Sequence, residues 1–297
     1  MSSPIRRRDF GRLVVGTSGA FGLHSTLRGH DQLNSTVKGV RLGVQTYSFR
    51  DRPLDATIEA IKQLRIGTCE LWSGHIEPLR ETRRSEDGRA KLRSFRLETP
   101  LSHFEKIGTL FHEAGIDLHA YNYSFRDDFT DDEIARGFEI AKALGAKVIT
   151  ASGTVSVAAR VNPHAKRYNM RVGMHNHSRI RENEFATPAD FAKASEDHSH
   201  IAVNLDIGHF VAAGFDPVEY IRQHHGRIVT LHIKDRKKEQ GENMPFGEGD
   251  TPIADVLTLL SENGFDMPAN IEYEYKGADS LAEVRKCIEY CKQALGA

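Results

Sequence analysis

Cysteine is scarce in this sequence, and its scarcity excludes a disulfide framework. The three cysteines, Cys69, Cys287 and Cys291, are too few and odd in number to cross-link a chain of 297 residues. Cys287 and Cys291 are four residues apart in a helical pattern, so one helix face can carry both. We expect small buried thiols without a catalytic role.

A strong excess of charge is also absent. The net charge is −1 with the histidines neutral, so no overall field would attract nucleic acid or an anionic membrane. Hydrophobic residues make up 39% of the chain, which is enough for a sizeable core. The composition therefore favours a globular protein without a nucleic-acid partner.

The N-terminus lacks the apolar length of a membrane span but resembles an export signal. Residues 7–15 read RRDFGRLVV, the order of arginines, phenylalanine and apolar residues in a twin-arginine signal. The apolar stretch is much shorter than the roughly 20 residues of a membrane span, so we predict no stable membrane anchor. We assign residues 1–38 to an export signal and flexible leader, with the twin-arginine export machinery as a partner and a periplasmic or extracellular location. A basic leader in a cytoplasmic protein is the alternative, because no clean cleavage site follows.

From residue 40 onward, short apolar runs alternate with helical patterns. Eight runs of four to six residues fit β-strands: Leu42–Tyr47, Thr68–Trp72, Asp117–Tyr121, Lys147–Ala151, Arg171–His175, Ile201–Asp206, Ile228–Ile233 and Asn270–Tyr273. No linker separates them, so they predict a single-domain (β/α)₈ TIM barrel over residues 39–297. An open doubly wound sheet fits less well, because such sheets usually have fewer strands and the first run lacks a G-x-G-x-x-G turn.

Helix signals occupy the segments between these strands. Thr187 and Asp216 each precede a proline, which places a capping residue ahead of a helix. The longest segment, residues 74–115, contains a charged stretch at 81–96 that we expect to form an extra, solvated helix. The alternative is a phosphate-binding use of three of its arginines, Arg83, Arg84 and Arg89.

Four successive predicted strands end in residue types that bind metals. These residues are His175, Asp206, His232 and Glu272. Active sites of such barrels lie at the C-terminal ends of the strands, so the four side chains should converge, although each alone is more often a hydrogen-bonded loop residue. Two carboxylates and two imidazoles suit one divalent ion. We expect Mn²⁺, with Co²⁺, Fe²⁺ or Zn²⁺ as alternatives.

Several short motifs, in their order and spacing, resemble one family. They are ELW at 70–72, HNH at 175–177, LDxGH at 205–209, HIKDR at 232–236, GEGD at 247–250 and IEYEY at 271–275. From about Val40 to Leu295 the chain resembles the sugar phosphate isomerase/epimerase family, the xylose-isomerase-like barrels. The resemblance implies metal ligation by Asp206, His232 and Glu272. It also implies that His209 contacts the substrate.

At the fifth strand the sequence departs from the family pattern. Ketose 3-epimerases of the family have a glutamate where this chain has His175, and their two glutamates exchange protons with the substrate. An imidazole can bind the metal or act as a base, because its pKa lies near neutrality. The departure keeps open a metal-dependent lyase or dehydratase reaction on a keto-sugar, such as elimination from a 3-keto-glycoside.

Further residues near the strand ends complete the predicted site. Lys234 alternates with His232, so it can face the same mouth and stabilise an enolate oxygen; the alternative is a surface cation. We assign catalysis to His175, Glu272 and Lys234. Substrate contacts are assigned to Glu70, Trp72, His177, His209 and Arg236. The sequence does not decide whether Glu70 faces the barrel mouth or forms a buried pair with a neighbouring strand. It also does not decide whether Trp72 stacks on a sugar or only packs against other side chains.

These residues together predict a metal-dependent sugar isomerase or epimerase that abstracts a proton beside a carbonyl held by the metal. The alternatives are a keto-sugar lyase or dehydratase, and an exported carbohydrate-binding protein without catalysis. A fourth reading, the DNA-repair endonuclease branch of the superfamily, conflicts with the near-zero net charge. Export favours an unphosphorylated sugar or glycoside as the substrate. Formation of a homo-oligomer stays open.

Overall fold

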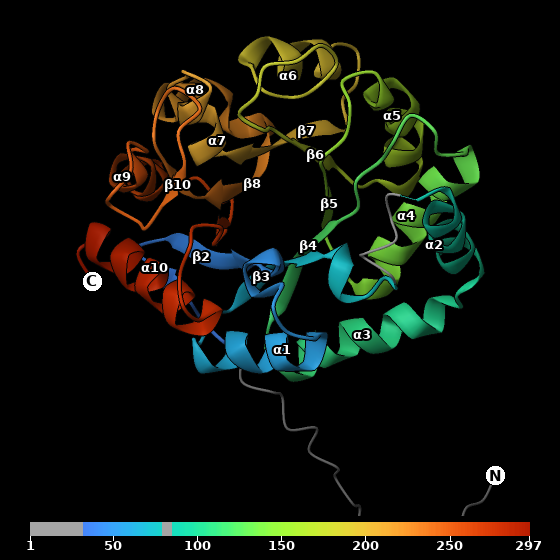
Figure 1. The fold of residues 1–297 in the computed structure, drawn as a ribbon, viewed down its shortest axis with the longest axis horizontal. Coiled ribbons are helices and arrows are strands. Elements are labelled where there is room, and N and C mark those ends of the chain that lie inside the picture. The colour runs from blue at the N-terminus through green and yellow to red at the C-terminus, as the bar shows by residue number, and fades with distance from the viewer. Residues whose placement is uncertain (1–31, 79–84) are drawn as a thin grey trace, which may run out of the picture.

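The computed structural model describes residues 32–78 and 85–297, which contain a closed ring of eight parallel strands (Figure 1). Pairing of the last strand with the first closes the ring. The strands, in ring order, are β2 (Val40–Gln45), β3 (Thr68–Trp72), β4 (Asp117–Asn122), β5 (Val148–Ala151), β6 (Val172–His175), β7 (Ile201–Asp206), β8 (Ile228–Ile233) and β11 (Ala269–Ile271). The predicted (β/α)₈ barrel is confirmed.

Helices surround this ring on its outer side (Figure 1). They are α1 (Leu54–Gln63), α2 (Glu86–Glu98), α3 (Leu101–Glu113), α4 (Asp131–Leu144), α5 (Val157–Tyr168), α6 (Pro188–Ser195), α7 (Ile207–Ala212), α8 (Pro217–His224), α9 (Ile253–Asn263) and α10 (Ser280–Ala294). Short strands lie outside the ring: β1 (Thr36–Val37) pairs with β2, and β9 (Asp235–Arg236) pairs with β10 (Asn243–Met244). Within the described ranges, no helix is both long and apolar enough to cross a membrane.

The expected helix caps are present. The Thr187 hydroxyl accepts a hydrogen bond from the Asp190 backbone N–H at the start of α6, and the Asp190 carboxylate accepts one from the Thr187 backbone N–H. The Asp216 carboxylate accepts hydrogen bonds from two backbone N–H groups of α8. Cys287 and Cys291 are buried on α10 as free thiols. The export-signal prediction falls mainly on residues 1–31, which lie outside the described residues, and it stays a prediction. The end of the predicted flexible leader is instead attached to the barrel, because Thr36–Val37 pairs with β2 and the Leu33 N–H donates to the Gly115 carbonyl at 2.8 Å.

Two predicted strands end earlier than expected. The first stops at Gln45, because its side-chain oxygen accepts a hydrogen bond from the Tyr47 N–H and starts a 3₁₀ turn over Thr46–Phe49. The eighth stops at Ile271, so Glu272 lies just beyond the strand. The Glu272 N–H still donates to the Ile233 carbonyl at 3.0 Å, which holds its backbone in line with β8.

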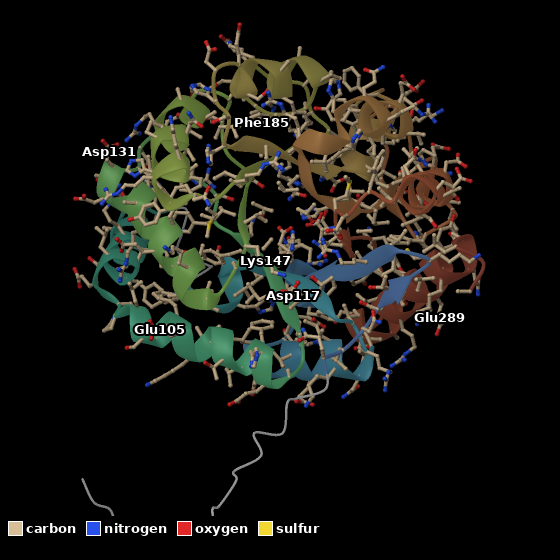
Figure 2. All side chains as sticks on the ribbon, turned by 180° about the vertical axis from the view of Figure 1, so that it is seen from behind. Glu105, Asp117, Asp131, Lys147, Phe185 and Glu289 are labelled. Carbon is tan, nitrogen blue, oxygen red and sulfur yellow. The ribbon has the colours of Figure 1, made fainter. Side chains whose placement is uncertain are left out.

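The barrel interior changes from apolar to polar towards the C-terminal ends of the strands. Side chains two residues apart on a strand face the same side, and a small apolar cluster is formed by Ala120, Val148, Ala202 and Val229. Two residues further along β5 and β7 come Thr150 and Asn204, both fully buried. The opposite end is seen in Figure 2, where Asp117 and Lys147, at the starts of β4 and β5, form an ion pair of 2.8 Å. The buried polar side chains of β5 and β7 thus lie on the mouth side of the apolar cluster.

In its described part, the charged stretch predicted at 81–96 forms the expected extra helix, and most residues of that helix are exposed. The helix α2 begins at Glu86, a second helix, α3, follows it, and Arg83 and Arg84 lie outside the described residues. Arg96 is buried on α2, and its guanidinium forms an ion pair of 2.7 Å with buried Glu77. Burial lowers the pKa of Arg96, but the carboxylate of Glu77 raises it above its ordinary value overall. This part of the segment is a structural ion pair.

Replacing Arg96 with methionine should lower the free energy of unfolding by about 3–5 kcal/mol, because the buried carboxylate of Glu77 loses its counter-ion. Urea denaturation measures this change. The matched control is Lys91→Met on the same helix, where the exposed pair of Lys91 and Asp87, at 2.7 Å, should contribute about 0–1 kcal/mol. Equal losses in the two variants would contradict a structural role for the buried pair.

Candidate metal centre

Four side chains meet at the mouth of the barrel. His175 ends β6, Asp206 ends β7, His232 lies in β8 and Glu272 follows β11. One ligand atom from each residue lies within 4.8 Å of all the others, and all four residues are buried. The convergence predicted from the strand ends is therefore present in the structure.

Each of the four residues has one buried polar atom outside the hydrogen-bond network. Within the described residues, none of these atoms makes a hydrogen bond of acceptable geometry: His175 Nδ1, Asp206 Oδ2, His232 Nδ1 and Glu272 Oε2. Three of these atoms are held by charge instead: His232 Nδ1 lies 3.2 Å from Glu272 Oε2, and Lys234 Nζ lies 3.1 Å from Asp206 Oδ2 and 2.8 Å from Glu272 Oε2. Among the described residues, His175 Nδ1 has neither kind of partner. Two imidazole nitrogens and two carboxylate oxygens form a donor set that fits a divalent transition-metal ion.

Glu70 fixes the orientation of His232. Its carboxylate lies 2.9 Å from His232 Nε2, and it also accepts hydrogen bonds from Gln45 Nε2 at 2.6 Å and Thr150 Oγ1 at 2.7 Å. Burial alone lowers the pKa of His232, but the carboxylates of Glu70 and Glu272 raise it well above its ordinary value. This contact leaves Nδ1 of His232 facing the cluster, the arrangement in which a carboxylate behind a histidine orients a metal ligand.

The assignment of Glu70 to substrate contact is not supported by this placement. Its side chain is fully buried and contacts His232 Nε2, whereas His232 Nδ1 faces Glu272. The alternation of β3 predicts only that Glu70 faces the barrel interior. It did not distinguish a position at the mouth from a buried pair, because both lie inside the barrel. In the structure, Glu70 forms the buried pair, with His232 as its partner.

Replacing Glu70 with glutamine should weaken binding of Mn²⁺ by about 10- to 100-fold, because an amide orients the His232 ring less firmly than a carboxylate does. Isothermal titration of the metal-free protein measures this change. Glu77→Gln serves as the comparison, since it also alters a buried carboxylate but lies outside the cluster. Unchanged affinity in Glu70→Gln would show that the contact is only structural.

Lys234 places a buried ammonium beside the cluster. Its Nζ lies 2.8 Å from Glu272 Oε2, 3.1 Å from Asp206 Oδ2 and 2.6 Å from Glu274 Oε2. Burial lowers the pKa of Lys234, but these three carboxylates raise it well above its ordinary value. The side chain is 2% exposed, so it is not the surface cation that the sequence left open.

Burial also sets the protonation of the candidate ligands. It raises the pKa of Asp206 to about 6, against the opposing effect of Lys234. Burial and the neighbouring His232 lower the pKa of His175 well below its ordinary value, so its imidazole is neutral at pH 7. Burial raises the pKa of Glu272, but Lys234 and His232 lower it well below its ordinary value overall. His175 and Glu272 are thus both in forms that accept a proton or bind a metal.

A cavity of about 350 Å³ opens from this cluster and contains most of the predicted contact residues. Trp72, His177 and His209 line it together with the cluster. Trp72 also packs edge-on against Tyr47, with ring centroids 5.0 Å apart, so packing and cavity lining occur together. Arg236 does not line this cavity; its guanidinium donates to His209 Nδ1 at 2.7 Å and therefore positions that ring.

Several lining residues were not predicted from the sequence. They are Gln45, Tyr47, Asn122, Ser152 and Glu274. Glu274 could have been found, because IEYEY alternates and places Glu274 on the same side as Glu272. The others are common polar residues at or just beyond strand ends, and nothing in their spacing singles them out.

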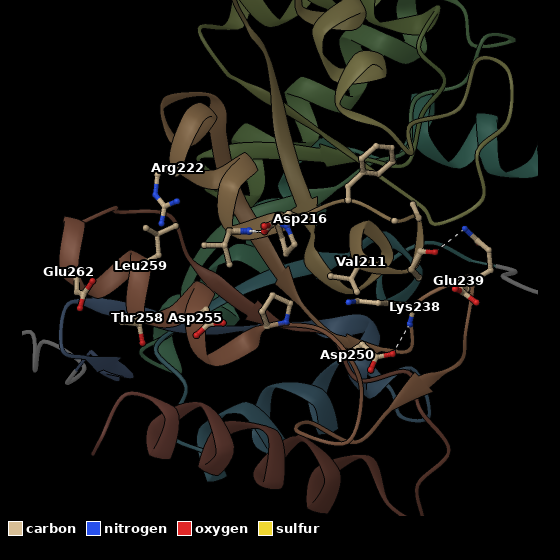
Figure 3. Close-up of a pocket in the computed structure, with 18 residues that line it drawn as sticks. Val211, Asp216, Arg222, Lys238, Glu239, Asp250, Asp255, Thr258, Leu259 and Glu262 are labelled. Carbon is tan, nitrogen blue, oxygen red and sulfur yellow. Dashed lines mark hydrogen bonds between the residues drawn. The ribbon is translucent and has the colours of Figure 1, made fainter.

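A larger groove of about 1010 Å³ lies outside the ring, beside α7, α8 and α9 (Figure 3). Its polar residues include Asp216, Arg222, Lys238 and Glu262, which occupy different parts of the groove in Figure 3. Arg222 pairs with Glu219 in solvent, at 59% and 49% side-chain exposure. None of the groove's residues belongs to the metal-type cluster found in the described residues. The barrel mouth is therefore the better candidate for chemistry.

Comparison with known proteins gives the same architecture. The solved structure of 3-keto-D-glucoside 4-epimerase YcjR from E. coli has a TM-score of 0.64 at 13% identity, covering 86% of this chain and 99% of that one. The IolI protein with a bound zinc atom has a TM-score of 0.61 at 16% identity, covering 86% and 96%. At these identities, the likeness shows the fold.

Sequence comparison extends to curated proteins. L-ribulose-5-phosphate 3-epimerase UlaE from Escherichia coli is 33% identical over 88 residues, which are 29% of this chain and 31% of that protein. The chain spans 31% to 38% of the length of the first curated relatives it matches. The model of one family, described as the xylose isomerase-like TIM barrel, matches residues 58–294. The chain therefore belongs to the xylose isomerase-like TIM barrel family.

Proposed function

We propose that this protein is a metal-dependent sugar isomerase or epimerase that moves a proton next to a substrate carbonyl. Its main support is the convergence of four buried residues of metal-binding types at the barrel mouth, with a buried lysine beside them. Relatives and structural neighbours named as sugar epimerases support this substrate class.

The residues that would hold the ion are His175, Asp206, His232 and Glu272. When bound, a divalent ion would act as a Lewis acid that polarises a carbonyl. We propose Mn²⁺ as this ion, with Co²⁺, Fe²⁺ or Zn²⁺ as alternatives; the zinc in the IolI structure shows that one neighbour with this fold can contain a metal.

The chain's own groups can handle the proton and the charge. Glu272 and His175 are both unprotonated at neutral pH, so either can accept a proton from the carbon beside the carbonyl. The Lys234 ammonium would stabilise negative charge that develops on the carbonyl oxygen, because it is fixed between carboxylates and shielded from water. Trp72, His177 and His209 would contact the sugar from the cavity walls.

A keto-sugar lyase or dehydratase is the second candidate. His175 stands where ketose 3-epimerases of the family have a glutamate, so a matched pair of carboxylates on opposite sides of the substrate is absent among the four cluster residues. One base that removes a proton is enough for elimination, whereas epimerisation also needs the proton returned on the other face. The presence of only one glutamate among the four cluster residues is therefore compatible with a lyase or dehydratase reaction.

The test is incubation of Mn²⁺-loaded protein with ketoses and 3-keto-glycosides in D₂O, followed by NMR. We expect deuterium at the carbon beside the carbonyl of a recovered or isomerised sugar. Release of the aglycone with an unsaturated sugar would select the lyase. Metal-dependent binding without label or product would contradict catalysis and favour a carbohydrate-binding protein.

A further inference from the structure

We infer that the substrate extends beyond the sugar ring at the metal centre and that a cleft next to the cavity binds an uncharged glycosyl substituent. This inference rests on the proposed function, because it takes the ring with the carbonyl to lie at the cluster. It adds the substrate class: a glycoside or oligosaccharide rather than a free monosaccharide or a sugar phosphate.

The cleft adjoins the cavity at the cluster. Three residues, Ser152, His177 and His209, line both spaces. The cavity at the cluster has about 350 Å³, the lower end of the range for ligand pockets, whereas the cleft has about 770 Å³. A single sugar ring bound at the cluster would leave the larger cleft without a ligand.

The walls of the cleft are tied together before any ligand binds. The Asp127 carboxylate, after β4, accepts hydrogen bonds from Ser156 Oγ at 2.9 Å and Thr154 Oγ1 at 2.8 Å, after β5. Thr154 also forms an antiparallel bridge with Glu184, in the loop after β6. That loop is fixed in turn to the next wall, because Arg236 donates to Ser178 Oγ at 2.9 Å. A preorganised cleft loses less entropy when it binds a ligand than a flexible one does.

The cleft also offers free hydrogen-bond donors. Among the described residues, the guanidinium groups of Arg126 and Arg179 form neither a hydrogen bond nor an ion pair, although both residues line the cleft. Arg181 has only a long contact of 3.6 Å with Glu184. Guanidinium groups present several N–H donors, which suit the closely spaced oxygens of a sugar.

The charge of the lining favours a neutral occupant over a phosphate. Three arginines are matched by three acidic residues, Asp127, Asp128 and Glu184. No net positive field therefore builds up to attract a phosphate. A mixture of N–H donors and carboxylate acceptors can instead satisfy hydroxyl groups, which both donate and accept.

Isothermal titration of the Mn²⁺-loaded protein with matched ketoses tests this inference. The probes are D-fructose, its 1- and 6-phosphates, and the glucosyl-fructose disaccharides linked through O1, O4, O5 or O6, all of which keep the keto group. We expect at least one disaccharide to bind about tenfold or more tightly than fructose and both phosphates. The double variant Arg126→Ala/Arg179→Ala should lose this advantage by about tenfold, the effect of one or two hydrogen bonds, while its affinity for fructose is kept.

The control variant is Arg222→Ala, an exposed arginine in the outer groove, which should bind every probe as the wild type does. Equal affinities for fructose and all disaccharides, tighter binding of a phosphate, or a disaccharide advantage that survives the double variant would each overturn the cleft assignment alone. If no probe binds in the presence of the metal, the proposed function fails and the cleft assignment fails with it.

Discussion

Replacing Glu272 with glutamine should reduce kcat/KM by about 10²- to 10⁴-fold, the usual contribution of a group that transfers a proton. The amide cannot accept a proton, and the substitution also removes the negative charge that Lys234 contacts at 2.8 Å. Steady-state kinetics at saturating Mn²⁺ measure the effect on turnover. Metal content must be determined in the same samples, so that loss of the ion is separated from loss of the base.

The matched control for this variant is Glu289→Gln, an exposed carboxylate on α10 that is remote from the mouth (Figure 2). It should leave kcat/KM unchanged. Glu272→Gln protein that keeps its metal and turns over at the wild-type rate would exclude Glu272 as the proton carrier. His175 would then be the remaining candidate among the cluster residues.

Removal of the metal is the second change with a large expected effect. Stabilisation of charge by a metal ion and fixed dipoles contributes several kcal/mol to catalysis, so chelation should reduce turnover by orders of magnitude and added Mn²⁺ should restore it. Because the ion binds the folded state only, about 100 times its Kd of Mn²⁺ should also stabilise the fold by about 2.7 kcal/mol. Activity assays and thermal unfolding with and without chelator measure both effects.

Full activity after exhaustive chelation would contradict a metal-dependent reaction. Stabilisation that persists in Asp206→Asn would place the ion elsewhere, because Asp206 is one of the four converging residues. This variant can also weaken the cap of α7, because the Asp206 carboxylate accepts a hydrogen bond from the His209 N–H at 2.6 Å. Such an effect would lower the stability of the metal-free protein and is measured there.

The fold was largely predictable because its signals are local and repeated. Each β-strand is short, apolar and bounded by polar turns, and caps such as Thr187 announce the following helix. The convergence of His175 with Asp206, His232 and Glu272 followed from topology alone, since parallel strands of a barrel bring their C-terminal ends to one mouth.

Contacts across the barrel and between loops were not predictable from such signals. Glu70 and His232 are 162 residues apart, and only the closed ring shows which of two inward positions the carboxylate takes. Arg96 looked solvated because its helix is highly charged, yet its side chain is covered and paired with Glu77. Both cases depend on partners that one-dimensional periodicity does not identify.

The proposed function depends on the binding of one divalent metal ion by the four side chains at the barrel mouth. Anomalous diffraction from crystals grown with Mn²⁺, collected at the manganese edge, tests it most directly. We predict one strong peak between the side chains of His175, Asp206, His232 and Glu272, each of which offers a ligand atom within 4.8 Å of the others. No peak at that position, with the four side chains ordered, would contradict the metal centre and the function proposed from it.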